Sequence, residues 1–518
     1  MLTLRNITSR LSVTVGPGCA WFALLAVANL LCAGCDSRSS ATPADTKSDF
    51  ASIDVSSNWL QLVPEQRPAF DPSIHDYVID CSSGTVDLTA TGAADLGFVY
   101  LGTTMQPTFN RATSAAAFRQ TVPLTPGQAM RFNLPSLGNY SVRCLPPDFP
   151  PLSVSISGTP QAEWYVFTPD LTGSGAGDYA IITDAHGTPV WWRQELGAAP
   201  IDAKVLDSNH ITWARFNFGG VYLVRDFNGQ LVNRLTGELD IHDLQPTDKG
   251  TYLSIRYLTR VCPPDCADLS PWGGDAQMGV TDGEIVEIDA DSNVLWSWNT
   301  RDHIALSETG GAGWLPGVGA DIIHMNAVEP DGDDAVLFSA RHLDAIYRVI
   351  KSTGAIDWKI GGTPRAESLT VVGDLRPTAI GTNGQPLNGQ HDVRRWPDGT
   401  VSVHDNGTNA GRPPSVIRYQ LDTTNRTATV VQELHDDRMT TSGCCGSARL
   451  LPGGNWLVAW GGGTYMTELD PQGTPLFTIN YNSDPTFSYR AVPVMPGVVS
   501  AVTLRVGMDA MYRNPPTE

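Results

Sequence analysis

The sequence is short of charge, and of positive charge above all. Charged residues make up 17% of its 518 residues, and 34 Lys and Arg face 54 Asp and Glu, giving a formal net charge of -20 and a pI near 4.8. A phosphate backbone is bound by clustered basic side chains. The deficit therefore argues against a nucleic-acid partner, and any anionic substrate must find a local positive pocket.

Glycine-rich nucleotide loops are missing as well. No Walker-type loop occurs, and no dinucleotide fingerprint follows an expected strand and opens a helix. Histidine and cysteine do not occur together at the spacing of a zinc site. We therefore predict a protein with no cofactor and no metal.

Little in the composition favours long amphipathic helices, whereas turn-forming residues are plentiful. Gly (50), Pro (37) and Trp (14) suit many short strands joined by turns. The length leaves one or two large units open, because all-β architectures often use roughly 200 residues or more for one domain.

Residues 1–35 predict an export signal. Two arginines precede the apolar run 20–31, which is too short for a membrane span. Ala33-Gly34-Cys35 resembles a lipoprotein processing site, after which Cys35 would carry the lipid. Residues 36–48 are rich in Ser, Thr and Asp and predict a flexible tether. We expect an exported protein of the periplasm or cell envelope, attached to the membrane through lipidated Cys35.

Six cysteines remain beyond the signal, an even number that favours disulfides in an oxidising compartment. Proximity pairs Cys262 with Cys266, and Cys81 would then pair with Cys144. The adjacent residues Cys444-Cys445 either form a vicinal disulfide or stay reduced.

Residues 49–160 predict a small β-sandwich domain. Short apolar stretches such as 77–81 and 140–144 alternate with turns there. The segment 68–77 resembles the start of cadherin-like β-sandwich modules. No cluster of polar groups in this region indicates catalysis.

Residues 161–518 contain a repeat of two alternating half-units. The outer one is a strand, an Asp-x-x-Gly-like turn and a second strand, because Asp accepts turn hydrogen bonds and Gly or Asn tolerates positive φ. Its copies are 179–192, 222–235, 285–298, 346–360, 416–431 and 465–479. The inner one is also a hairpin, with copies at 202–216, 242–257, 324–341, 391–406, 447–462 and 489–506. Together they predict a six-bladed β-propeller whose first and last segments complete one blade and hide the sheet edges.

Three histidines occupy the same place in consecutive inner half-units. His242, His324 and His391 each lie eight residues before a turn glycine, at 250, 332 and 399, and the last copy has Tyr489 at this place. Equivalent repeat positions are equivalent places in a ring, so we expect the imidazoles to converge on one mouth of a central channel. A structural role is the alternative, but it predicts a histidine in most blades. The other histidines are expected to be structural: His75, His186, His210, His303, His342, His404 and His435.

Motifs around these histidines resemble those of the bacterial aryl-sulfate sulfotransferases. They are Ile241-His242-Asp243, Asp321-Ile322-Ile323-His324-Met325-Asn326, Ser339-Ala340-Arg341, Gly389-Gln390-His391-Asp392, Asp405-Asn406-Gly407 and Gly446-Ser447-Ala448-Arg449. The resemblance implies that His391 is transiently sulfurylated. It also implies that His242, His324 and Arg341 bind the sulfate group, and that Asn326 lies near the donor.

The chemistry of sulfuryl transfer needs these residue types. By analogy with phosphoryl transfer, the transition state is loose and anionic, so the site needs cations and one nucleophile. Neutral His391 would attack sulfur and give a sulfohistidine and ping-pong kinetics. Arg341 offers a forked cation, and protonated His242 or His324 would hold oxygens or protonate the departing phenoxide. The expected partners are a phenolic sulfate donor and a phenol acceptor, with Tyr489 as an aromatic contact.

Two other functions stay open. Thr353-Gly354 to Trp358 is similar to repeats of the quinoprotein dehydrogenases, which are eight-bladed propellers with a bound chromophore. A non-enzymatic binding scaffold is the second alternative, because propellers often serve as interaction platforms. A homodimer also stays open.

Overall fold

The structure is a computed structural model that describes residues 59–91, 97–101, 110–111, 117–134, 138–170, 176–216, 220–308, 320–376, 386–482 and 487–515. The predicted export signal, tether and lipidated Cys35 lie outside these residues. Within them the helices are α2 (Ala501–Arg513) and four 3-10 turns, Ser270–Trp272, Thr300–Asp302, Leu306–Glu308 and Arg341–Leu343. All other elements are strands, which confirms the predicted all-β class. No described helix is both long enough and apolar enough to cross a membrane.

The N-terminal part contains two sheets that share one hydrophobic core. One consists of β1 (Trp59–Val63), β3 (Thr85–Thr91) and β6 (Ala117–Pro123). The other has the order β2-β8-β7-β4-β5 and consists of β2 (Asp76–Ile79), β4 (Gly97–Leu101), β5 (Asn110–Arg111), β7 (Ala129–Leu134) and β8 (Gly138–Cys144). Leu88 of the first sheet and Tyr140 of the second are buried in this core together with the predicted Cys81–Cys144 disulfide.

Six further sheets are each built around four antiparallel strands. The first contains β10 (Trp164–Asp170), β11 (Tyr179–Asp184), β12 (Pro189–Gln194) and β35 (Phe487–Val494). The second contains β13 (Pro200–Val205), β14 (His210–Arg215), β15 (Gly220–Asp226) and β16 (Leu231–Leu239). The third contains β17 (Leu244–Pro246), β18 (Tyr252–Thr259), β19 (Val280–Ile288) and β20 (Val294–Asn299), with β21 (Ala320–Asp321) paired to β19.

The remaining three sheets follow the same order. The fourth contains β22 (Met325–Pro330), β23 (Ala335–Ala340), β24 (Ala345–Ile350) and β25 (Ile356–Gly361). The fifth contains β27 (His391–Arg395), β28 (Thr400–Asp405), β29 (Ser415–Asp422) and β30 (Thr427–Leu434), with β26 (Thr370–Val372) on β30. The sixth contains β31 (Ser447–Leu450), β32 (Trp456–Ala459), β33 (Tyr465–Leu469) and β34 (Pro475–Asn480). Its outer edge is extended by β9 (Ser153–Ile156), which falls within the range predicted for the N-terminal domain.

The hairpins form where the sequence places its turn residues. All six outer hairpins and five of the six inner ones are present as antiparallel pairs. In four outer turns the aspartate Oδ1 accepts the N–H four residues later at 2.8 Å, namely at Asp184, Asp226, Asp289 and Asp470. The side-chain hydrogen bond that identified these turns is therefore the one that closes them.

The prediction of a last inner hairpin at 489–506 is wrong in its second half. β35 has no hairpin partner after it, because the chain turns at Gly497 and enters α2, whose N-cap Ser500 accepts the Thr503 N–H at 3.0 Å. β35 pairs with β10 instead. The first sheet therefore consists of one strand from the C-terminal end of the repeat region and three from its N-terminal end. The sequence had predicted two strands from each end.

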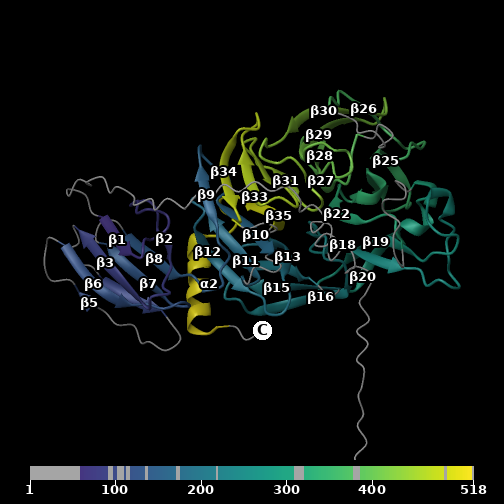
Figure 1. Ribbon diagram of the computed structural model, residues 1–518. Helices are drawn as coiled ribbons and strands as arrows, with labels where there is room; N and C mark the ends of the chain where they lie inside the picture. Colours follow the sequence, from purple (N-terminus) through teal and green to yellow (C-terminus); the bar gives the residue numbers. More distant parts are fainter. Residues whose placement is uncertain are drawn as a thin grey trace, which may run out of the picture.

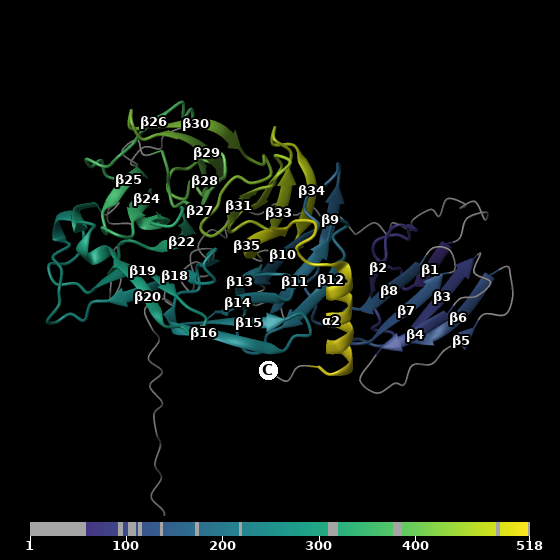
Figure 2. The same ribbon diagram turned by 180° about the vertical axis from the view of Figure 1, so that it is seen from behind.

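The six sheets follow one another around a common centre in both views, with β35, β13, β22 and β27 toward the middle and β12, β16, β25 and β34 toward the outside (Figures 1 and 2). Each of the six sheets contributes one edge strand to this centre. These central strands contact one another in the order β17, β22, β27, β31, β35 and β13. Lys204 of β13 closes the remaining step, since its Nζ donates to the Leu244 carbonyl at 2.7 Å. The helix α2 lies between these sheets and the N-terminal part, where Arg505 pairs with Asp76 (Figure 1).

A buried network of charges joins these central strands. The Asp243 carboxylate accepts from Lys204 Nζ at 3.0 Å, Arg490 Nη1 at 2.8 Å and Arg394 Nη2 at 2.9 Å. Asp392 accepts from Arg394 at 2.7 Å. Burial alone would raise the pKa of Asp243, but the surrounding cations hold it well below its usual range. Paired charges of this kind tolerate burial, and here they fill the middle of the ring of strands.

Candidate functional site

The predicted histidines and Tyr489 meet at the beginnings of central strands. His242 lies two residues before β17, His324 directly precedes β22, His391 begins β27, and Tyr489 lies in β35. The His242 ring lies 5.0 Å from the His324 ring and 5.6 Å from the Tyr489 ring, measured between centroids. The repeat position therefore brings together side chains that are far apart in the sequence.

An aspartate holds each of the first two histidines. Asp240 accepts both the backbone N–H and Nδ1 of His242, and Asp321 does the same for His324 at 2.8 and 2.6 Å. Because a carboxylate accepts only, Nδ1 carries the proton in each ring and Nε2 is left to meet a ligand. Burial lowers the pKa of His324, and Asp321 opposes that shift. Sequence reasoning missed both aspartates, although an acid two or three residues before each histidine was a visible signal.

His391 is held as a neutral imidazole in one tautomer. Its Nδ1 lies 3.0 Å from the Gly389 carbonyl and 2.8 Å from Asn406 Oδ1, while Nε2 accepts the Cys445 N–H at 3.1 Å. A carbonyl only accepts and an amide N–H only donates, so Nδ1 is protonated and Nε2 holds the lone pair. Burial lowers the pKa of His391 well below its ordinary value, and the Arg341 cation adds to this.

Asn406 is oriented so that its oxygen faces this ring. Its Nδ2 donates to Ser442 Oγ at 2.7 Å and to the Cys445 carbonyl at 3.0 Å. The amide nitrogen is therefore turned away from His391, and Oδ1 is fixed against Nδ1. Asn406 lies within a motif that the sequence singled out, but only the structure gives it this part.

Arg341 lies beside the histidines in a 3-10 turn that directly follows β23. Nη1 donates to His342 Nε2 at 2.9 Å, and Nη2 donates to the Gly443 carbonyl at 2.7 Å. Burial lowers the pKa of Arg341 to about 10, which still leaves it charged at neutral pH. The guanidinium is thus a cation whose orientation is set before any ligand binds.

His342 was expected to be structural, but it belongs to this group. Its ring stacks on that of His324 with centroids 4.5 Å apart. Since Nε2 accepts from Arg341, Nδ1 must be the atom that donates to the Asp321 carbonyl, at 2.5 Å. No repeat position marked His342, because it sits in the turn after β23 and not at the start of a central strand.

Asn326 is fully buried and bonds to the backbone beside the nucleophile candidate. Its Nδ2 donates to the Gln390 carbonyl at 2.7 Å, and its own carbonyl accepts Arg490 Nη2 at 2.6 Å. The Tyr489 hydroxyl also approaches that carbonyl, at 3.5 Å. These contacts give Asn326 a supporting position next to His391.

Asp321, His324 and His342 also form a group that could hold a metal ion, with ligand atoms within 4.8 Å of one another. Arg341 Nη1 lies 2.9 Å from His342 Nε2, which places a permanent cation beside this group. A permanent cation at that distance disfavours a metal, so the group fits an anion better.

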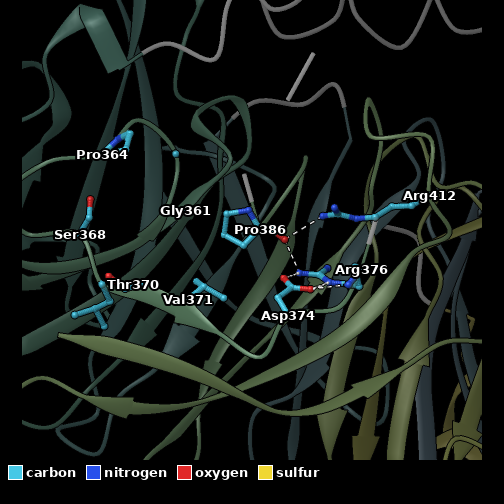
Figure 3. Close-up of a pocket in the computed structure, with 11 residues that line it drawn as sticks. Gly361, Pro364, Ser368, Thr370, Val371, Asp374, Arg376, Pro386 and Arg412 are labelled. Atoms are coloured by element: carbon cyan, nitrogen blue, oxygen red, sulfur yellow. Dashed lines mark hydrogen bonds and ion pairs between the residues drawn. The ribbon is translucent and has the colours of Figure 1, made fainter. Parts of the chain in front are cut away.

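A separate cavity of about 410 Å³ opens between the fourth and fifth sheets (Figure 3). Arg376, Arg412 and Asp374 form its charged wall, and both guanidinium groups reach the Pro386 carbonyl (Figure 3). None of the predicted site residues lines it. Both arginines also pair with Asp405, so this wall carries balanced charge and no net positive field.

The sequence matches one family model. That model is described as arylsulfotransferase (ASST), and it covers residues 221–482, which include His242, His324, Asn326, Arg341 and His391. No curated protein matches this chain.

The comparison with solved structures gives matches of low identity and low TM-score. A protein of unknown function from Bacteroides caccae has 9% identity and a TM-score of 0.39, with 64% of this chain and 99% of that chain covered. Virginiamycin B lyase from Staphylococcus aureus has 10% identity and a TM-score of 0.32, with 62% and 87% covered. The Dos1 propeller has 9% identity and a TM-score of 0.33, with 66% and 88% covered.

Proposed function

This chain belongs to the arylsulfotransferase family, and from that membership we propose that it transfers a sulfuryl group from an aryl sulfate ester to a phenol without a nucleotide. His391 acts as the nucleophile, Arg341 binds the sulfuryl oxygens, and His242 and His324 assist. The observation that carries this proposal is the tautomer of His391. Its Nδ1 is held by two acceptors, which leaves Nε2 with the lone pair in a neutral ring.

The proposed function goes with a proposed architecture, a six-bladed propeller that follows a β-sandwich domain. The six sheets around a common centre are the blades of a propeller, and the two N-terminal sheets are a β-sandwich ahead of it. Because β9 pairs with β34, we place the end of the sandwich domain before Ser153. Export and a lipid anchor at Cys35 remain predictions from the sequence.

In the first half-reaction, His391 Nε2 attacks the sulfur of the donor. A nitrogen–sulfur bond forms, and the bond from sulfur to the phenolic oxygen breaks, so the electron pair leaves with the phenoxide. The ring then carries a positive charge, which the Gly389 carbonyl and Asn406 Oδ1 stabilise through the Nδ1 proton. A phenol acceptor reverses these steps in the second half-reaction, which gives ping-pong kinetics.

Arg341 and the paired histidines supply the charge that this reaction needs. The loose transition state places negative charge on the sulfuryl oxygens and on the departing oxygen. Arg341 is buried, and its hydrogen bond to His342 orients the guanidinium before the donor binds. Protonated His324 gives its proton to the phenoxide, and Asp321 stabilises the charged ring.

This assignment predicts how activity depends on pH. Burial lowers the pKa of free His324 below its ordinary value, so kcat/KM for an aryl sulfate should fall as the pH rises and the ring loses its proton, and this fall should begin below the pH at which an exposed histidine titrates. His391 stays neutral in this range, because its pKa is lower still. Replacing Asp321 with asparagine removes an effect that raises the His324 pKa. The D321N profile should therefore fall at a lower pH than that of the unmodified protein.

The matched control for this measurement is Asp302→Asn, which removes an exposed carboxylate from a 3-10 turn. Its pH profile should coincide with that of the unmodified protein. A D321N profile with an unmoved alkaline limb would show that His324 does not supply the proton.

The central test is incubation with a chromogenic aryl sulfate, with and without a phenol, in the absence of any nucleotide. Release of the chromophore should depend on the phenol acceptor, and peptide mass analysis after the donor alone should find a sulfuryl group on His391. A modified residue other than His391 would overturn the nucleophile assignment. No transfer under any of these conditions, before or after reduction of the protein with dithiothreitol, would overturn the proposed function.

A further inference from the structure

The segment 442–446, here called the cysteine loop, lies against His391 and carries a vicinal disulfide. Cys444 and Cys445 are bonded to each other, and the Cys445 N–H donates to His391 Nε2 at 3.1 Å. Cys444 is half-buried, whereas Cys445 and His391 are buried, with only 1% of His391 exposed. The atom that the proposed reaction uses is therefore covered by the backbone of this loop.

This contact and the attack on sulfur exclude each other. An unprotonated imidazole nitrogen has one lone pair, which lies in the plane of the ring. While that pair accepts the Cys445 N–H, it cannot form a bond to sulfur. The donor can react only after the Cys445 amide has moved away from Nε2.

The cysteine loop also binds Arg341 and Asn406, two other residues of the proposed site. The Gly443 carbonyl accepts Arg341 Nη2 at 2.7 Å. Ser442 Oγ and the Cys445 carbonyl accept from Asn406 Nδ2, which sets the direction of Asn406 Oδ1. A shift of this loop thus changes the nucleophile, the cation and the amide that orients the nucleophile, all together.

The disulfide restrains the backbone that makes these contacts. It closes a small ring that includes the peptide bond between the two cysteines, whose Cα atoms lie 3.8 Å apart as in a trans peptide. Cys445 has a φ of 67°, a conformation that side chains other than glycine rarely adopt. The ring therefore fixes the direction of the Cys445 N–H toward His391.

We propose that the cysteine loop is a redox-dependent cap, which covers His391 Nε2 while the disulfide is intact and releases it on reduction. This cap depends on the proposed function in one respect, namely that His391 is the nucleophile. A dithiol reductant supplies two electrons and two protons, the sulfur–sulfur bond breaks, Cys444 and Cys445 become thiols, and the reductant becomes a disulfide. Half-buried Cys444 is the sulfur that the reductant can reach.

Diethyl pyrocarbonate tests the cap without sulfuryl chemistry, because it acylates an imidazole nitrogen that has an available lone pair. The rate of modification at His391 would be followed by peptide mass analysis in the oxidised protein, in the protein reduced with dithiothreitol, and in Cys444→Ala/Cys445→Gly. Glycine suits the positive φ at 445, so this variant keeps the backbone path. We expect modification about tenfold faster in the last two samples, the effect of losing one hydrogen bond.

The matched control is Cys262→Ala/Cys266→Ala, which removes a second half-buried disulfide of short sequence separation. Its His391 should react at the rate of the oxidised protein and accelerate on reduction as the unmodified protein does. Equal rates at His391 in the oxidised, reduced and Cys444→Ala/Cys445→Gly samples would overturn the cap. If the Cys444→Ala/Cys445→Gly variant does not fold, the rates at His391 in the oxidised and reduced proteins still test the cap.

The same samples distinguish this proposal from the proposed function. Faster acylation on reduction, together with no sulfuryl transfer from an aryl sulfate in any sample, would keep the cap and overturn the function. Sulfurylation of His391 at one rate in the oxidised and reduced proteins would keep the function and overturn the cap. Sulfurylation that accelerates along with acylation supports both.

Discussion

Replacing His391 with alanine should lower the turnover of aryl sulfate by about 10⁴-fold or more, while the protein stays folded. The variant removes the atom that forms the bond to sulfur, and neither Asp nor Glu is a substitute, because a carboxylate repels an anionic donor. His391 is buried, and the hydrogen bonds of its ring go to Asn406, Gly389 and Cys445, so alanine leaves the strand β27 and its backbone pairing in place. The measurement is the initial rate of chromophore release, with far-ultraviolet circular dichroism to check the fold.

The matched control is His303→Ala, which removes an exposed ring that stacks on Trp298. Its rate should equal that of the unmodified protein. If the H391A protein retained full activity with an aryl sulfate donor, His391 would not be the nucleophile, and another residue of the group would have to be sought by mass analysis.

Arg341→Ala should lower kcat by about 10²- to 10³-fold, the loss expected when one preorganised donor to a transition state is removed. Arg341 is the cation that His342 and Gly443 hold in place, and its charge opposes the negative charge that develops on the sulfuryl oxygens. Lysine keeps the charge but not the fork of donors, so Arg341→Lys should recover only part of the lost rate.

Arg301→Ala is the control for this pair of variants, because Arg301 forms an exposed ion pair with Asp265. Exposed pairs contribute about 1 kcal/mol or less, so neither its stability nor its rate should change much. An R341A rate equal to that of the R301A protein would remove Arg341 from the site.

The likeness of residues 353–358 to quinoprotein repeats has a structural explanation. Gly354 lies in the turn between β24 and β25, and its carbonyl accepts Trp298 Nε1 from the neighbouring sheet at 2.8 Å. Trp191 binds the Phe227 carbonyl in the same way, also at 2.8 Å. The turn at Gly354 and the tryptophans Trp191 and Trp298 therefore join adjacent sheets, which gives these positions a structural role.

Local signals in the sequence were sufficient for all the predicted hairpins except the last one, and for the place of the histidines. Asp184 and Asp226 close their turns through bonds within four residues, so the pattern is readable without the rest of the chain. The equal spacing of His242, His324 and His391 from their turn glycines placed them at the start of successive strands. The disulfide at Cys81–Cys144 followed from position in the sequence: once Cys262 is paired with Cys266, Cys81 and Cys144 are the two cysteines of the predicted N-terminal domain.

Tertiary structure alone decided the features that depend on segments distant in sequence. Residues 501–513 became a helix because β10 already pairs with β35, which leaves α2 to pack against β12 and the N-terminal part. His342 joined the site because the turn after β23 reaches His324, and no repeat position records that approach. Likewise, the hydrogen bond between the Cys445 N–H and His391 Nε2 joins two neighbouring sheets and has no local sequence signal. Only the tertiary structure shows that the His391 lone pair is occupied.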